Sequence, residues 1–311
     1  MSAERDSAVE AFLQYVRHER GLSPHTVAAY QRDLRDFQSF LAGHMDLPAW
    51  GWGDVDRLDI RSWLGALDAR GLKRSTVARK LSAARAFYRF LHRTSAVSHN
   101  PARLVRTPRK RRELPGYLTR SQAEALFDSL EEYAAADRPL ATRDRAIIEL
   151  AYSCGLRLAE LCGLDDRDVD LERGLAKVVG KGGKERIVPI GGRAREALAE
   201  YLDCRSGVSD RPPLEGGGAR PLFVSRRGTR ISRRQVQRSV SAWLTRAAEG
   251  ESLSVHALRH TFATHMLDAG ADLLVVKELL GHSSLSTTRV YTHTSRERLV
   301  RAYRQAHPRA D

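Results

Sequence analysis

Four side chains in the C-terminal quarter of the chain have types and spacings that suit chemistry on an anion. His256, Arg259, His282 and Tyr291 lie within 36 positions of one another. Apolar residues recur at helical spacing after the first histidine, so His256 and Arg259 share one face at the start of a helix. A helix start that carries an arginine binds anions readily. A phenol, with an ordinary pKa of about 10, attacks as a nucleophile only where cations and a base help it lose its proton, so Tyr291 is the candidate nucleophile.

Each of these residues also has an ordinary explanation. A tyrosine between two helices usually packs in a core or lies on a surface. His256 and His260, four positions apart, could suggest a metal site. The sequence has no HExxH segment and no cysteine pair at CxxC spacing, so we predict neither a metal nor a cofactor.

The charge distribution predicts a large anionic partner. The chain has 311 residues and a net charge of +14. Residues 70–112 contain 14 Lys or Arg, residues 220–246 contain 8 Arg, and neither block contains an acid. Because folded surfaces usually intersperse the two signs, two acid-free blocks favour binding to nucleic acid.

The cysteines and the hydropathy pattern favour a cytoplasmic protein. Cys154, Cys162 and Cys204 have neither a disulfide-framework nor a metal spacing. The charged N-terminus lacks the apolar segment of a signal peptide, and no run of about 18 apolar residues occurs. We therefore expect neither secretion nor membrane insertion.

The N-terminal third predicts four amphipathic helices that form a small bundle. They span residues 8–21, about 18 residues from Pro24, residues 58–70 and a segment that begins at Ser75. Arginines at four-residue steps lie off the apolar row of the fourth helix, which suits phosphate contacts or, alternatively, an ordinary solvated face. The predicted DNA contacts of the whole chain are Lys73, Arg74, Lys80, Arg85, Arg89, Arg233 and Arg234.

A basic, proline-rich segment at 101–116 indicates an extended linker to a second domain. Beyond it, Thr119 and Gln122 form a capping-box pattern. Two β-rich runs that meet at a glycine-containing turn predict a hairpin at 175–190. Helices are predicted at 123–133, 143–154, 193–202, within 226–248, at 273–280 and at 296–305, and a flexible loop at 206–221.

The fold class predicted from these patterns is mainly α. A four-helix N-terminal domain is expected at 1–105, a basic linker at 106–117, and a mixed helical domain with a small β-hairpin at 118–311.

Several short segments resemble the tyrosine recombinase (phage integrase) family, whose signature is HxxR, then a His or Trp, then a nucleophilic Tyr. They are 155-GLRLAEL-161, 180-GKGGKER-186, 256-HALRH-260 and 281-GHSSLSTTRVYTH-293. The last of these and the ending 306-AHPRA-310 are similar to the Xer branch, most of all to its XerC group. Ala159 stands where the family often has Ser, and Val255 where it often has Pro. We expect both departures to be tolerated.

The resemblance implies a role for each candidate residue and a tyrosine recombinase fold. Tyr291 would form a 3′-phosphotyrosyl link, two arginines would clamp the phosphate, a hairpin lysine would protonate the leaving oxygen, and two histidines would assist. The implied catalytic residues are Arg157, Lys181, His256, Arg259, His282 and Tyr291. Strand exchange by this route needs neither metal nor ATP.

The resemblance also implies partners. These are a double-stranded DNA recombination site, a second Xer-type recombinase in a cyclic heterotetramer, and a septal DNA translocase. The terminal helix would dock on a neighbouring protomer, and the function would be the resolution of chromosome dimers. A phage or transposon integrase, a type IB topoisomerase-like enzyme and a nonenzymatic DNA-binding protein are the alternatives.

Overall fold

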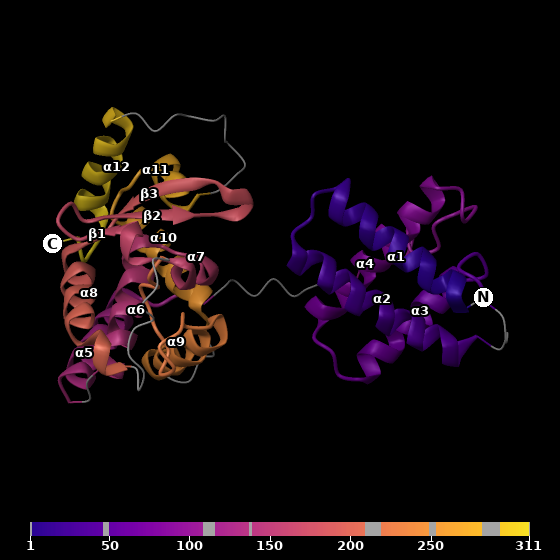
Figure 1. Cartoon of the computed structure of the whole chain (residues 1–311), viewed down its shortest axis with the longest axis horizontal. Helices are drawn as coiled ribbons and strands as arrows, with labels where there is room; N and C mark the ends of the chain where they lie inside the picture. The colour runs from indigo at the N-terminus through magenta and orange to yellow at the C-terminus, as the bar shows by residue number, and fades with distance from the viewer. Residues whose placement is uncertain are drawn as a thin grey trace. The chain divides into compact units, whose positions relative to one another are not determined.

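The computed structural model describes residues 2–45, 50–107, 116–136, 139–208, 219–248, 253–281 and 293–310. The chain divides into two compact units, Met1–Glu113 and Leu114–Asp311 (Figure 1). As the sequence predicts, the fold is mainly helical with one small sheet. No helix within these ranges combines the length and apolar character needed to cross a membrane.

The described residues of the first unit form four helices, and the predicted bundle is confirmed. They are α1 Ser2–His18, α2 Pro24–His44, α3 Arg57–Ala69 and α4 Arg74–Arg93. Their apolar faces meet in one aromatic core, in which Phe37, Trp63 and Phe87 are buried. The first helix begins at Ser2 rather than at residue 8, because its polar first turns carry no apolar period that would mark them.

Side-chain caps set where two of the predicted helices begin. The Ser23 hydroxyl accepts a hydrogen bond from the Thr26 amide at the start of α2, and Pro24 occupies the first helical position. In the second unit, the Gln122 amide donates to the Thr119 hydroxyl while the Thr119 amide donates to the Gln122 side chain. This reciprocal pair is the predicted capping box, and it starts α5.

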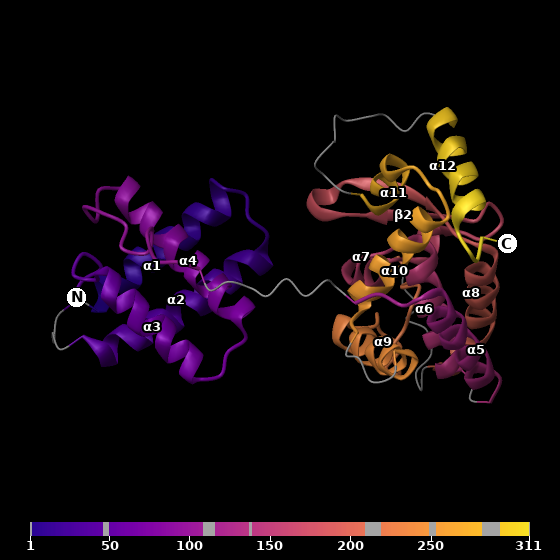
Figure 2. The same cartoon turned by 180° about the vertical axis from the view of Figure 1, so that it is seen from behind.

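The second unit contains the remaining helices (Figure 2) and an antiparallel sheet of strand order β1-β2-β3. Its strands are β1 Val169–Asp170, β2 Leu175–Val179 and β3 Glu185–Pro189. Its α-helices are α5 Arg120–Ala136, α6 Leu140–Cys154, α7 Leu158–Gly163, α8 Gly192–Cys204, α9 Arg233–Ala247, α10 Val255–Asp268, α11 Leu273–Leu280 and α12 His293–Ala306. Short 3-10 turns occupy Asp166–Asp168, Lys181–Gly183 and Arg205–Val208.

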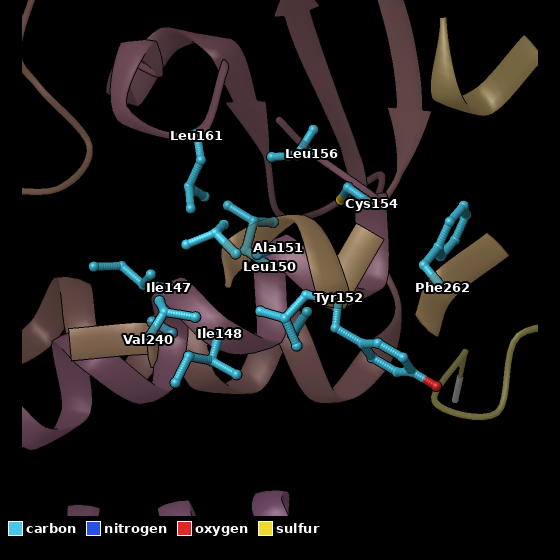
Figure 3. Packing of buried hydrophobic residues seen from close by; sticks show 14 of the residues in the cluster. Ile147, Ile148, Leu150, Ala151, Tyr152, Cys154, Leu156, Leu161, Val240 and Phe262 are labelled. Atoms are coloured by element: carbon cyan, nitrogen blue, oxygen red, sulfur yellow. The ribbon is translucent and has the colours of Figure 1, made fainter. Parts of the chain in front are cut away.

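Helix α6 is the centre of the second unit. All residues from 145 to 154 are buried, and α5, α8, α9 and α10 pack around them. Figure 3 shows buried α6 side chains from Ile147 to Cys154 together with Val240 of α9 and Phe262 of α10. The helix ends at Gly155, which has a left-handed φ of 57°. A Cβ there would lie 2.7 Å from Phe262 Cδ1 and 2.8 Å from Leu280 Cδ2, so only glycine lets the end of α6 meet α10 and α11.

The predicted hairpin is confirmed as β2 and β3, which pair in register from Leu175↔Pro189 to Val179↔Glu185. Its turn holds Gly182 and Gly183, both at positive φ, where glycine is the favoured residue. The two-residue strand β1 adds an edge that the sequence did not predict, because it is too short for a period of two to be visible.

The last helix packs against its own unit. Leu299 and Tyr303 on α12 are buried, and the Tyr303 hydroxyl lies 2.7 Å from the Ser153 hydroxyl on α6. The buried residues of α12 therefore rest on the body of their own unit.

Candidate active site

Arg157 and Arg259, which are 102 positions apart in the sequence, meet at the C-terminal end of α11. Arg157 is the N-cap of α7, and its Nη2 donates to the carbonyl of Gly281 over 3.2 Å. Arg259 lies on the second turn of α10, and its Nη2 donates to the carbonyl of Leu280 over 2.6 Å. The two guanidiniums that the sequence predicted as a phosphate clamp are thus brought together, one residue before His282.

Helix chemistry explains why arginines gather at this place. The last carbonyls of a helix have no partner within the helix, and its C-terminal end carries partial negative charge, so cations bind there favourably. Helix α11 ends at Gly281, whose φ of 65° is the left-handed value predicted for the residue after the helix. The chain turns at that glycine and leads directly into His282.

A glutamate that the sequence analysis did not single out holds Arg157 in place. Glu160 is 6% exposed, and its Oε1 accepts from Arg157 Nη1 over 2.7 Å while its Oε2 accepts from the Arg157 amide over 2.9 Å. The signal was a Glu three positions after a helix start, which is the capping-box spacing. Arg186 on β3 binds the same carboxylate and is the second residue that was missed.

The electrostatics of this cluster favour an anion. Burial and repulsion from Arg157 together lower the pKa of Arg259 to about 10, although Glu160 opposes the shift. At neutral pH the guanidinium still carries its charge. Three guanidiniums against one carboxylate leave the cluster positive, which suits the binding of a phosphate.

Of the other four predicted catalytic residues, two lie within the described part of the chain. His256 is exposed, at the second position of α10. Lys181 lies in the 3-10 turn of the hairpin by its backbone. His282 and Tyr291 lie outside the described residues, so their predicted roles stay predictions.

The predicted DNA contacts divide into exposed and buried residues. Five of them are exposed, namely Lys73, Arg74, Arg89, Arg233 and Arg234. Lys80 corrects the sequence prediction, because it is 7% exposed and its Nζ lies 3.0 Å from Asp36 Oδ2 and 3.5 Å from Asp33 Oδ1. An ammonium held by two carboxylates inside the bundle does not reach a phosphate.

Arg85 also has a structural role. Its guanidinium donates to the Ala102 carbonyl over 3.1 Å, to the Thr107 hydroxyl over 2.8 Å and to the Val105 carbonyl, so it anchors the segment that follows α4. Within the described ranges, no three His, Cys, Asp or Glu side chains gather as they would around a metal ion.

Two family models match this chain. The Phage integrase family matches residues 116–298, and the phage integrase N-terminal SAM-like domain matches residues 9–95. The chain belongs to the phage integrase family. This membership confirms the resemblance to tyrosine recombinases and agrees with the helical fold of both units.

Curated relatives confirm the Xer branch as well. The tyrosine recombinase XerC of Pelobacter propionicus is 49% identical over 302 residues, which are 97% of this chain and 95% of the relative. The tyrosine recombinase XerC of Halalkalibacterium halodurans is 42% identical over 310 residues and aligns over 100% of both chains.

Solved structures share the fold at lower identity. The Tn1549 transposon integrase in complex with circular intermediate DNA has a TM-score of 0.68 and 20% identity, over 94% of this chain and 98% of the other. The XerH site-specific recombinase bound to palindromic difH substrate has a TM-score of 0.68 and 21% identity, over 95% of this chain and 84% of the other. At these identities the likeness shows the fold alone.

Proposed function

We propose that this chain is a site-specific DNA recombinase that cuts and rejoins DNA through a 3′-phosphotyrosyl intermediate. The observation that carries the proposal is the meeting of Arg157 and Arg259 at the end of α11, one residue before His282. The 49% identity with a tyrosine recombinase XerC supports it over nearly the whole chain.

In the proposed reaction, the Tyr291 oxygen attacks the phosphorus of a DNA phosphodiester. The bond from phosphorus to the 5′-oxygen breaks, and a bond to the tyrosine oxygen forms. His256 accepts the tyrosine proton, and the Lys181 ammonium gives a proton to the leaving 5′-oxygen. His282 donates a hydrogen bond to the phosphate. The 5′-hydroxyl of a second strand then reverses these steps and releases the enzyme.

The arginines supply the electrostatic part of the catalysis. A phosphodiester that gains a fifth oxygen accumulates negative charge on its nonbridging oxygens. Besides the α11 carbonyls, Nη1 of Arg157 donates to Glu160 and Nη1 of Arg259 donates to Gly155, and the remaining N–H groups of the two arginines would bind these oxygens. Because Arg259 is only 9% exposed, it binds phosphate in a setting where water competes weakly.

The exposed basic residues would supply binding rather than chemistry. Lys73, Arg74 and Arg89 lie on or next to α4 of the first unit, and Arg233 and Arg234 start α9 of the second. We propose a DNA-binding domain at 1–105, a linker at 106–117 and a catalytic domain at 118–311. Phosphate contacts from both domains would fix the enzyme on its site.

We further propose that the protein acts in the cytoplasm on a recombination site at the chromosome terminus, where it resolves chromosome dimers. The XerC relatives support this assignment. The partners would be a second Xer-type recombinase in a cyclic heterotetramer and a septal DNA translocase.

A covalent-trapping assay tests the proposal. The wild-type protein is incubated with nicked duplexes tiled across a chromosome-terminus fragment, and protein–DNA adducts are resolved on a denaturing gel. We expect an adduct with the wild type, none with Tyr291→Phe, and at most traces with Arg157→Ala or Arg259→Ala. A wild-type protein that binds but forms no adduct would leave only the nonenzymatic reading.

The same substrates separate recombination from relaxation. Two labelled duplexes that exchange strands give products of new length, which a type IB topoisomerase-like enzyme does not produce. Adducts on a mobile-element end, with none on the terminus fragment, would favour an integrase instead.

A further inference from the structure

Arg186 is a buried cation that the proposed reaction does not use. It lies on β3 and is 5% exposed, on the same face of the strand as the buried Val188. Its Nη1 and Nη2 donate to Glu160 Oε1 and Oε2, both over 2.9 Å, and its Nε donates to the Leu279 carbonyl over 2.9 Å. One guanidinium therefore ties the hairpin to α7 and to the end of α11.

Arg186 completes a collar of three arginines around the end of α11. The carbonyls of Leu279, Leu280 and Gly281 accept from Arg186, Arg259 and Arg157 in that order. The three arginines come from a strand, a helix and a helix N-cap. Each consecutive carbonyl is thus held by a different element of the unit.

The carboxylate of Glu160 links two members of the collar. Its Oε1 accepts from both Arg186 Nη1 and Arg157 Nη1, over 2.9 and 2.7 Å. Arg186 occupies the carboxylate in a bidentate manner and so leaves Arg157 only one side-chain hydrogen bond to it. The second Nη of Arg157 is thereby directed to the helix end instead.

Gly281 fits against Arg186. A Cβ on this glycine would lie 3.1 Å from Arg186 Cδ and 3.2 Å from Nη1, a tight contact that would require the Arg186 side chain to shift. The guanidinium thus packs directly on the backbone at the point where the chain turns toward His282.

We infer that Arg186 is a positioning residue for DNA cleavage, an inference that rests on the proposed function. It keeps Glu160 from pairing bidentately with Arg157, and it fixes the end of α11 between the two phosphate-binding arginines. Without Arg186, the Glu160 carboxylate can accept two side-chain hydrogen bonds from Arg157. The Arg157 guanidinium then turns away from the phosphate, and the carboxylate neutralises its charge. The loss falls on phosphate activation and not on protonation of the leaving group.

Single-turnover cleavage with two leaving groups tests this inference. The duplexes are nicked substrates that carry the mapped cleavage site with either the natural 5′-oxygen or a 5′-sulfur at the scissile bond. A sulfur leaving group departs without a proton, so it relieves the need for a general acid. The variants are Arg186→Gln, Lys181→Met as the leaving-group control, and Arg193→Gln, which removes an exposed arginine paired with Glu196 on α8.

We expect Arg186→Gln to cleave the oxygen substrate about 100-fold more slowly than wild type, the loss typical of a misplaced reacting group, with an unchanged Kd for the duplex. The 5′-sulfur restores Lys181→Met but not Arg186→Gln, and Arg193→Gln behaves as wild type on both substrates. If Arg186→Gln does not fold, Arg186→Lys takes its place, because a lysine keeps the charge but not the fork. We expect Arg186→Lys to lose the same cleavage rate, and the 5′-sulfur not to restore it.

Two results would overturn the inference while leaving the proposed function intact. One is an Arg186 variant that cleaves as fast as the wild-type protein, in an assay in which the wild-type protein does cleave. The other is rescue of the Arg186 variant by sulfur as complete as that of Lys181→Met, which would assign its effect to the hairpin lysine. A wild-type protein that forms no adduct refutes the proposed function itself, and this inference with it.

Discussion

Replacing Glu160 by glutamine tests the electrostatic core of the site. The side chain is buried, and its carboxylate accepts four hydrogen bonds, two from Arg186 and two from Arg157. Burial by itself raises the pKa of Glu160. The hydrogen bonds from the Arg186 side chain and the Arg157 amide, with the nearby positive charges, outweigh burial and lower the pKa from 4.5 to about 2. Glu160→Gln keeps the shape of the group but removes its charge.

The pKa change sets the size of the effect. A carboxyl whose pKa falls from 4.5 to about 2 on folding contributes about 3 kcal/mol to the free energy of unfolding at neutral pH. Removing one partner of a buried ion pair costs about 3–5 kcal/mol, which agrees with that figure. Because the folded pKa is lowered, the contribution is complete above pH 4.5 and is lost as the pH falls toward 2.

Hydrogen exchange measures this contribution in the full chain. The slowest amides of α6 report the unfolding free energy of the second unit alone, since this helix forms its core. We expect Glu160→Gln to lower that free energy by about 3 kcal/mol at neutral pH and by much less near pH 3. A loss below about 1 kcal/mol, or one that does not depend on pH, would show that the carboxylate acts as a surface ion pair and refute the reasoning.

Three further predictions concern the second unit and its reaction. In thermal unfolding, Gly281→Ala should destabilise the second unit by about 1–2 kcal/mol, because the φ of Gly281 is left-handed and a Cβ would crowd Arg186. Gly163→Ala, whose Cβ would meet open space, is the control. His265→Leu should cost about 1–3 kcal/mol in urea unfolding, because the ring accepts from the Tyr152 hydroxyl and donates to a buried carbonyl; an unchanged midpoint would contradict this. The rate of adduct formation should be unchanged in excess chelator, and its loss would contradict the metal-free scheme.

Local patterns were sufficient for most of the helices. The apolar period of α4 and the Thr119 capping box fix their elements within a few neighbouring residues, so the sequence alone predicts them. The predicted ends of the helices at 143–154 and 273–280 are also confirmed, and a glycine follows each of them in the sequence. The first turns of α1 and the short β1 carry no such pattern, and they were missed.

Contacts between residues far apart in the sequence could not be predicted from such local patterns. Lys80 borders the apolar row of α4, and only the packing of α2 shows that Asp33 and Asp36 face it. Arg186 lies in a β-rich run of the sequence. Its charge at a position on the buried face of the strand was the available sign that it has a structural role. That signal says the arginine needs a buried partner, but Glu160 is 26 positions away, and tertiary structure alone identifies it.

The central claim is that Arg157 and Arg259 hold one phosphodiester for attack by Tyr291. Mass spectrometry of the trapped protein–DNA adduct, after nuclease and protease digestion, tests it most directly. The account predicts one modified peptide, with a nucleotide 3′-phosphate bonded to the oxygen of Tyr291. A nucleotide on any other residue, or one attached through a 5′-phosphate, would contradict it.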